Sequence, residues 1–148
     1  MFERVLIAVD FSECAVAALE VARREFPQAS RKLLYVLDIN ETKTSEALQD
    51  ALLGGHHRED AALQASHELE AQCWPGEVAD AVVGLPAEEI LACSRTWNAD
   101  LIVMGTQGRR GLSHLVFGSV AEAVVRTSAI PVLTVRQVKA KGEPRLGT

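Results

Sequence analysis

The sequence lacks three common motifs for phosphate binding or nucleophilic catalysis. No Gly-Lys-Ser or Gly-Lys-Thr occurs, which excludes the Walker pattern, and the first apolar run is followed by VDFSEC instead of a G-x-G-x-x-G loop. The G-x-S-x-G nucleophile elbow is also absent, which argues against a hydrolase of that design. Any phosphate site in this chain must therefore be built in another way.

Cysteine is scarce, and no apolar stretch is long enough to span a membrane. Cys14, Cys73 and Cys93 form no C-x-x-C pair, so we interpret them as packing residues in a reducing cytoplasm. The N-terminal segment has no small-residue cleavage site, which favours a first strand over a signal peptide. A net charge of −5 argues against non-specific binding to nucleic acid or to anionic membranes. The composition predicts a soluble, cytoplasmic domain.

Short apolar runs alternate with amphipathic segments along the 148 residues. Strands are predicted at residues 4–9, 32–39, 76–83, 99–105 and 131–136, and the alternating pattern of residues 76–83 indicates a less buried strand near a sheet edge. Helices are predicted at residues 12–26, 59–72, from 86 onward, and at 119–127. This alternation predicts an α/β fold with a doubly wound open sheet of five parallel strands, order 3-2-1-4-5, flanked by helices. We expect one domain over residues 1–137 and a flexible polar tail at 138–148.

A glycine-rich loop, GTQGRRGLSHLVFGS, follows the fourth predicted strand. Ligands bind beyond the carboxyl ends of strands where the strand order reverses, so Asp10 and Gly105 would flank one crevice. Gly105 and Gly108 would allow the backbone to approach a ligand closely. Gly118-Ser119 would place the start of the next helix there, where free N–H groups and the helix dipole favour phosphate. Three further donors follow in the same loop: Arg109, Arg110 and His114.

Several of these residues also have a purely structural interpretation. Ser119 and Glu122 match the S-x-x-E capping box, so Ser119 either caps its own helix or binds phosphate. Asp10 either caps the first helix or contacts a ligand, and Gly84 either only turns the chain or belongs to the site. The adjacent pair His56-His57 lacks a third convergent ligand, which argues against a metal site there.

Five sequence blocks resemble those of the universal stress protein family, in the family's order: VLIAVDFSE, YVLD, VVGLPAEEI, ADLIVMGTQGRRGL and IPVLTV. The spacing from Gly105 through Gly108 to Gly118-Ser119 matches the G-x2-G-x9-G-[ST] pattern of the ATP-binding members of the family. The resemblance covers nearly the whole chain and implies a Rossmann-like fold that binds an adenine nucleotide.

The resemblance also implies a role for individual residues. The backbone around Val36 would bind adenine, and Ala8 and Asp10 would line the adenosine pocket. Ala8 stands where some ATP-binding members have proline. Met104 and Gly105 would lie beside the ribose. The phosphates would be surrounded by Gly108, Arg109, Gly118, Ser119 and Val120, with Asp10 as the contact for Mg²⁺.

These features predict a cytoplasmic regulatory protein that binds ATP with Mg²⁺ and signals to a protein partner as a homodimer. The resemblance implies dimer contacts through the last strand, residues 131–136, where a bare apolar edge would invite pairing. Two alternatives remain open: a slow ATPase or phosphoryl- or adenylyl-transferring enzyme, and a nucleotide-independent dimerisation module. Phosphoryl transfer requires a positioned nucleophile, and no base is evident for it. Whether residues 52–58 form an ordered lid also stays open.

Overall fold

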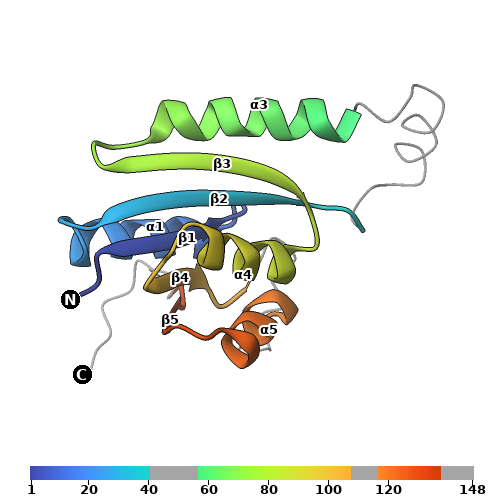
Figure 1. Cartoon of the computed structure of the whole chain (residues 1–148). Coiled ribbons are helices and arrows are strands. Elements are labelled where there is room, and N and C mark those ends of the chain that lie inside the picture. Colours follow the sequence, from blue (N-terminus) through green and yellow to red (C-terminus); the bar gives the residue numbers. More distant parts are fainter. Residues whose placement is uncertain (41–56, 108–116, 138–148) are drawn as a thin grey trace, which may run out of the picture.

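The computed structural model describes residues 1–40, 57–107 and 117–137. Its five strands form one parallel sheet in the order β3-β2-β1-β4-β5, which confirms the predicted fold class (Figure 1). The strands are β1 Arg4–Val9, β2 Ser30–Asp38, β3 Glu77–Gly84, β4 Leu101–Gly105 and β5 Val132–Val135. Since β1 and β4 are neighbours, the chain after Asp10 and the chain after Gly105 leave the sheet side by side.

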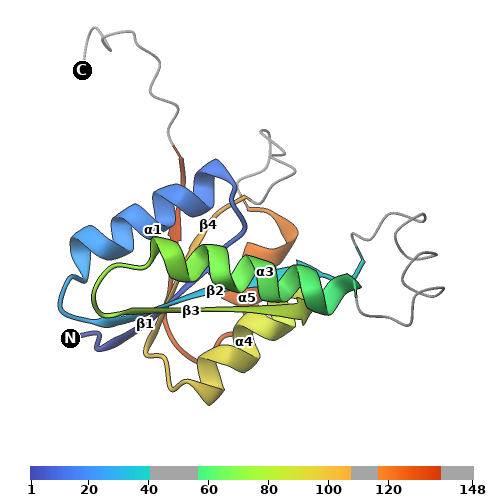
Figure 2. The same ribbon diagram turned by 90° about the horizontal axis from the view of Figure 1, so that it is seen from above.

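Four helices are described: α1 Glu13–Glu25, α3 His57–Gln72, α4 Pro86–Thr96 and α5 Ser119–Thr127. Figure 2 shows α1 and α3 on one side of β1, β2 and β3, with α4 on the other. Two apolar clusters fill the layers, one beneath α1 and α3 and one beneath α4 and α5. The sheet is therefore covered on both faces, as parallel sheets require.

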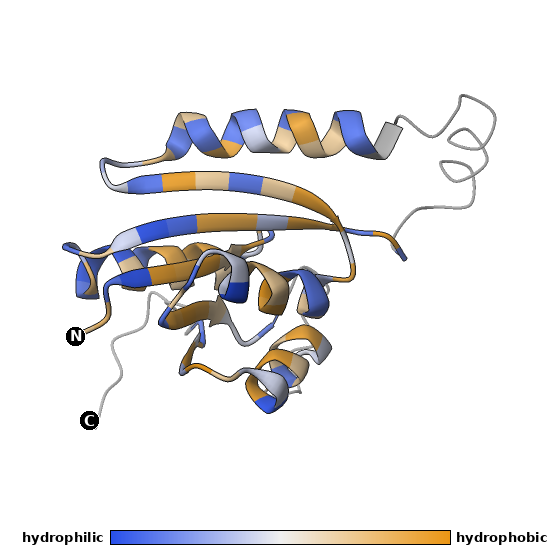
Figure 3. Ribbon diagram, viewed as in Figure 1, coloured by the Kyte–Doolittle hydropathy of each residue, from blue (hydrophilic) through white to orange (hydrophobic). Residues whose placement is uncertain are grey.

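Continuous apolar runs in the central strands serve both layers. Ile7 and Val5 belong to the cluster under α1 and α3, whereas Leu6 between them belongs to the opposite cluster, and all three are fully buried. Burial of each such side chain contributes about 1.5–3 kcal/mol. Figure 3 shows the central parts of β1 and β2 as hydrophobic and α3 as largely hydrophilic.

The connection from β1 into α1 is fixed by two side chains. Ser12 is the N-cap of α1, where its Oγ accepts the Ala15 N–H at 3.2 Å. Asp10 does not cap the helix itself, because its Oδ1 accepts the Ser12 N–H at 2.9 Å, ahead of the first turn. The second carboxylate oxygen of Asp10, Oδ2, takes no part in this hydrogen bond.

The three cysteines are free thiols and partly buried. Burial raises the pKa of the Cys73 and Cys93 thiols, which keeps them protonated and poorly nucleophilic. No helix among the described residues is long and apolar enough to cross a membrane. The predicted tail at residues 138–148 lies outside the described part of the chain, and the domain bounds stay a prediction.

Candidate functional site

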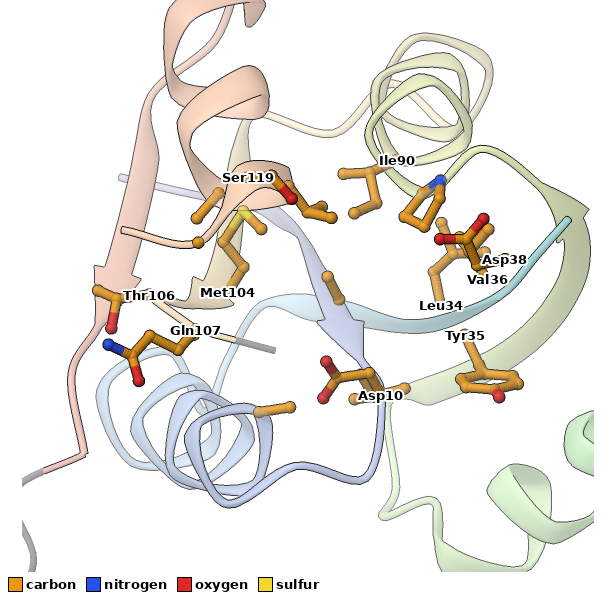
Figure 4. A pocket seen from close by; sticks show the side chains of 18 of the residues that line it. Asp10, Leu34, Tyr35, Val36, Asp38, Ile90, Met104, Thr106, Gln107 and Ser119 are labelled. Atoms are coloured by element: carbon orange, nitrogen blue, oxygen red, sulfur yellow. The ribbon is translucent and has the colours of Figure 1, made fainter. Parts of the chain in front are cut away.

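A cavity of about 390 Å³ lies beyond the carboxyl ends of β1, β2 and β4 and beside the first turns of α4 and α5 (Figure 4). Its volume falls in the range of small-molecule sites, and its position is the expected ligand crevice of an open parallel sheet. Most of the predicted site residues line it: Ala8, Asp10, Val36, Met104, Gly105, Gly118, Ser119 and Val120.

The other predicted residues lie elsewhere or outside the description. Gly84 does not line the cavity; it ends β3, where an added Cβ would lie 2.6 Å from the Glu89 carboxylate. This contact gives Gly84 a local structural role, which was one of its two interpretations. The structure does not describe Gly108, Arg109, Arg110, His114 or residues 52–56, nor the side chains of His57 and Arg58.

The start of α5 forms one end of the cavity. The first amide donated within this helix is that of Glu122, which bonds the Gly118 carbonyl at 3.0 Å. The three preceding amides, those of Ser119, Val120 and Ala121, therefore have no acceptor within the helix, and all three residues line the cavity. Together with the positive end of the helix dipole, they are suited to an anion.

The capping-box interpretation of Ser119 is wrong. Gly118 is the N-cap residue, Ser119 is the first residue of α5, and no side chain caps this helix among the described residues. Glu122 forms an ion pair with Arg126 one turn later instead of folding back onto Ser119. The motif matched because Ser-x-x-Glu is also compatible with serine one position inside the helix. Because Ser119 does not cap α5, the first amides of this helix are left without a side-chain acceptor.

The other end of the cavity is built from β2 and α4. Figure 4 shows Leu34, Val36 and Asp38 along β2, facing Ile90, with Thr106 and Gln107 across the cavity. Residues alternate between the two faces of a strand, so these three β2 side chains share one face. The apolar side chains of Leu34 and Val36 are thus followed along β2 by the carboxylate of Asp38. Asp38 accepts the Asn40 N–H at 2.8 Å through Oδ1.

The backbone of β2 also presents polar groups to this cavity. The Ser30 amide bonds Glu3, on the β1 side, whereas the Arg31 and Ile39 amides bond Gly76 and Gly84, on the β3 side. By the alternation of a parallel ladder, even-numbered residues of β2 direct their N–H and C=O groups toward β1.

The β1–β2 register ends with Val9 opposite Tyr35. The Val36 carbonyl and the Asp38 N–H therefore lie past the last paired residue of β1. They form an acceptor and a donor side by side on an open strand edge at the cavity.

Sequence reasoning missed Tyr35, Asp38, Asn40, Thr106 and Gln107, all of which line the cavity. Four of them stand at or just after the ends of β2 and β4, so the rule that ligands bind at the carboxyl ends of strands would have found them. Tyr35 had no such signal, because its ring is nearly buried and packs against Phe11 with ring centroids 5.2 Å apart.

The charge at the cavity comes from carboxylates. Asp10 and Asp38 line it, and the described lining residues include no lysine, arginine or histidine. Within residues 1–40, 57–107 and 117–137 there is also no group of three or more His, Cys, Asp or Glu side chains that could hold a metal ion. The described donors for an anion are thus backbone amides, and Asp10 would need ligand oxygens to complete a cation site.

Known proteins with the same fold match nearly the whole length of this chain. The model of the universal stress protein family matches residues 1–136. A universal stress protein of Methanocaldococcus jannaschii, MJ0531, is 32% identical and covers 94% of this chain and 85% of its own length. The solved structure of MJ0577 from the same organism superposes with a TM-score of 0.76 at 28% identity, over 95% of this chain and 99% of that one.

Two further solved structures of this family contain adenine nucleotides. One is a universal stress protein in complex with cAMP (TM-score 0.56, covering 90% of this chain and 97% of that one), and the other is from Archaeoglobus fulgidus in complex with dAMP (0.52, covering 91% and 98%). Both are 20% identical to this chain, so the likeness shows the fold alone.

Proposed function

Because this chain belongs to the universal stress protein family, we propose that it binds an adenine nucleotide in the cavity beside β2 and α5 and acts as a nucleotide-dependent regulatory protein. One observation carries the proposal: a single cavity has uncapped helix amides at one end and an open strand edge at the other. The nucleotide complexes of two proteins of this fold are consistent with it.

The base would lie at the β2 end. Adenine offers a donor at its 6-amino group and an acceptor at N1, which complement the Val36 carbonyl and the Asp38 N–H. Hypoxanthine offers the reverse pair, an O6 acceptor and an N1–H donor. Two buried mismatches would each cost about 1–3 kcal/mol, so the open edge of β2 favours adenine over hypoxanthine.

The phosphates would lie at the α5 end, on the amides of Ser119, Val120 and Ala121. ATP brings more negative charge than AMP to a cavity that already contains Asp10 and Asp38. Mg²⁺ is commonly bound by one or two carboxylates together with substrate phosphates, and Asp10 fits that role. We therefore propose ATP with Mg²⁺ as the working ligand, with the metal neutralising the charge on the phosphates.

We propose that the protein binds the nucleotide but does not hydrolyse it efficiently. Efficient hydrolysis needs a group that orients or deprotonates water, and the described lining residues supply carboxylates but no histidine or lysine. A regulatory protein needs instead a surface for a partner. We propose that β5, at the edge of the sheet, pairs with β5 of a second copy.

The test is calorimetry on protein freed of nucleotide by unfolding and refolding. We expect AMP, and ATP with Mg²⁺, to bind more tightly than 1 mM, and IMP to bind at least about tenfold more weakly than AMP. The proposal fails if neither AMP nor ATP binds more tightly than millimolar.

A matched pair of variants tests the α5 end. Proline is well tolerated at the first position of a helix, and Gly118 before it is already extended, so Ser119→Pro should fold while losing one amide donor. Ser119→Ala loses only the hydroxyl. We expect S119P to weaken AMP binding about tenfold relative to S119A, because a hydrogen bond to a charged group contributes about 1.5–3 kcal/mol. Adenosine, which has no phosphate, should bind both variants equally.

A further inference from the structure

Phe11, directly after Asp10, has an unusual backbone conformation. Its φ is 63°, in the left-handed region that bulky residues rarely occupy. An L-residue there costs about 1–2 kcal/mol, so surrounding contacts must hold it. The strained residue Phe11 lies between the end of β1 and the start of α1.

Phe11 is also the residue that would cover the open edge of β2 if β1 continued. The Glu3 carbonyl accepts a bond from Ser30 of β2, whereas the Arg4 carbonyl accepts one from Asp100, on the β4 side. Odd-numbered residues of β1 therefore face β2, and Phe11 is the next odd-numbered residue after Val9.

One more ladder step would join both polar groups of Phe11 to β2. Its N–H would donate to the Val36 carbonyl, and its carbonyl would accept the Asp38 N–H. Those are the two β2 groups left open at the cavity. The left-handed turn takes the Phe11 peptide out of that ladder position.

We propose that Phe11 is a positioning residue whose left-handed turn keeps the β2 edge open, so that a nucleobase takes the ladder position that Phe11 would occupy if β1 continued. The inference rests on the proposed function only for the identity of the occupant. Extension of β1 by two residues, through Phe11, and binding of the base are then mutually exclusive, because both need the Val36 carbonyl and the Asp38 N–H.

Three contacts hold the turn. Asp10 accepts the Ser12 N–H at 2.9 Å, Ser12 caps α1 through the Ala15 N–H at 3.2 Å, and the Phe11 ring packs on Tyr35 at 5.2 Å. The ring of Phe11 remains about half exposed, so only part of its surface contributes to that contact. The conformation thus depends mainly on the backbone and on the hydrogen bonds of the Asp10 and Ser12 side chains.

A pair of variants separates backbone conformation from loss of the ring. Phe11→Asn and Phe11→Val both remove the aromatic ring, but asparagine tolerates the left-handed region and valine strongly disfavours it. We expect F11V to bind AMP about 5- to 30-fold more weakly than F11N, the ratio that corresponds to the strain of a left-handed residue. A merely structural Phe11 would lower the urea midpoint of F11V and leave the AMP affinity of the folded protein equal to that of F11N.

A second measurement needs no nucleotide. Hydrogen exchange of the Asp38 amide should be fast in the nucleotide-free wild type and in F11N, and at least tenfold slower in folded F11V, where a longer β1 would cover it. Equal Asp38 protection in folded F11N and F11V overturns the inference, whatever the ligand. If Asp38 protection changes as expected but no variant binds AMP, the role of Phe11 in keeping the β2 edge open is supported and the proposed function is refuted.

Discussion

At the scale of single residues, Gly105 shows how a glycine in a ligand loop also serves packing. Gly105 ends β4 and lines the cavity, and a Cβ at this position would lie 2.6 Å from the Cys14 Cβ and 2.8 Å from the Cys14 carbonyl carbon. Those atoms belong to the first turn of α1 and cannot move without moving the helix. The intolerance expected for this glycine therefore has a cause that is independent of any ligand.

Gly105→Ala and Gly84→Ala form a matched pair for this point. In G105A the new methyl group meets the α1 backbone, whereas in G84A it meets only the flexible Glu89 side chain, at 2.6–2.9 Å. Overpacking against fixed atoms typically costs about 1–3 kcal/mol, so urea unfolding should show that loss for G105A and less than about 1 kcal/mol for G84A. Equal unfolding free energies for the two variants would contradict this account.

Sequence reasoning at this scale depended on whether a residue's role is local. Ser12 sits three residues before the amide it accepts, so its cap could be predicted from the sequence. The contact between Gly105 and Cys14 joins two distant segments, and no local pattern announces it. The prediction that Ser119 caps α5 was wrong for a different reason, since the capping-box motif fixes a helix start only to within one residue.

At the scale of elements, a buried ion cluster joins α1, β2 and β3 at the end of the sheet away from the cavity. The Glu77 carboxylate accepts bonds from Arg23 at 2.7 and 2.9 Å, from Arg31 at 3.0 Å and from the Trp74 N–H at 2.9 Å, and the side chain of Glu77 is fully buried. Arg31 also donates to four backbone carbonyls, at Phe26, Pro27, Ala29 and Pro75. The cluster thus ties the amino ends of two strands to one helix.

The cluster predicts a loss of stability in acid. Burial alone would raise the pKa of Glu77, but the bonds from Arg23, Trp74 and Arg31 outweigh it and hold the pKa below its ordinary value. A carboxyl whose pKa is lowered in the folded state stabilises the fold above its unfolded pKa, about 4.3, and loses that contribution as the pH falls through the folded pKa. The unfolding free energy should therefore decline below about pH 4.

Glu77→Gln isolates this contribution. The variant should lose about 3 kcal/mol at pH 7, because two arginines are left around a neutral group, and it should show a weaker acid decline than the wild type. Glu25→Gln is the control, since Glu25 forms an exposed pair with Arg24 and its loss should change the unfolding free energy by less than about 1 kcal/mol. An identical pH dependence in wild type and E77Q would rule out Glu77 as the titrating group.

At the scale of the whole molecule, the fold was predictable because each helix and strand has a local sequence pattern and connections between parallel strands are right-handed. Apolar runs, and for β3 an alternating apolar and polar pattern, indicated the strands, and right-handed crossovers left few strand orders to consider. The site was only partly predictable for the opposite reason. The open edge of β2 exists because β1 ends at Val9, opposite Tyr35, whereas β2 continues to Asp38, and that relation between strands appears only in the register.

The outer edge of β5, the last strand of the sheet, is the basis of the last prediction, on assembly. Ile102 and Thr106 of the β4 side bond the carbonyls of Pro131 and Val135, so odd-numbered residues of β5 face β4. The Thr134 N–H therefore points away from β4, to the outer edge of the sheet. Pairing between two β5 strands would use this donor.

Thr134→Pro removes the Thr134 N–H without breaking a bond to β4, since proline is accepted on edge strands whose N–H faces outward. Light scattering after gel filtration should find a dimer for the wild type and for Thr134→Ala, which keeps the donor, and a monomer for T134P. The AMP affinity and circular dichroism spectrum of T134P should match those of the wild type, because β5 contributes no residue to the cavity lining. A dimeric T134P would place the interface elsewhere, and a monomeric wild type would refute the assembly itself.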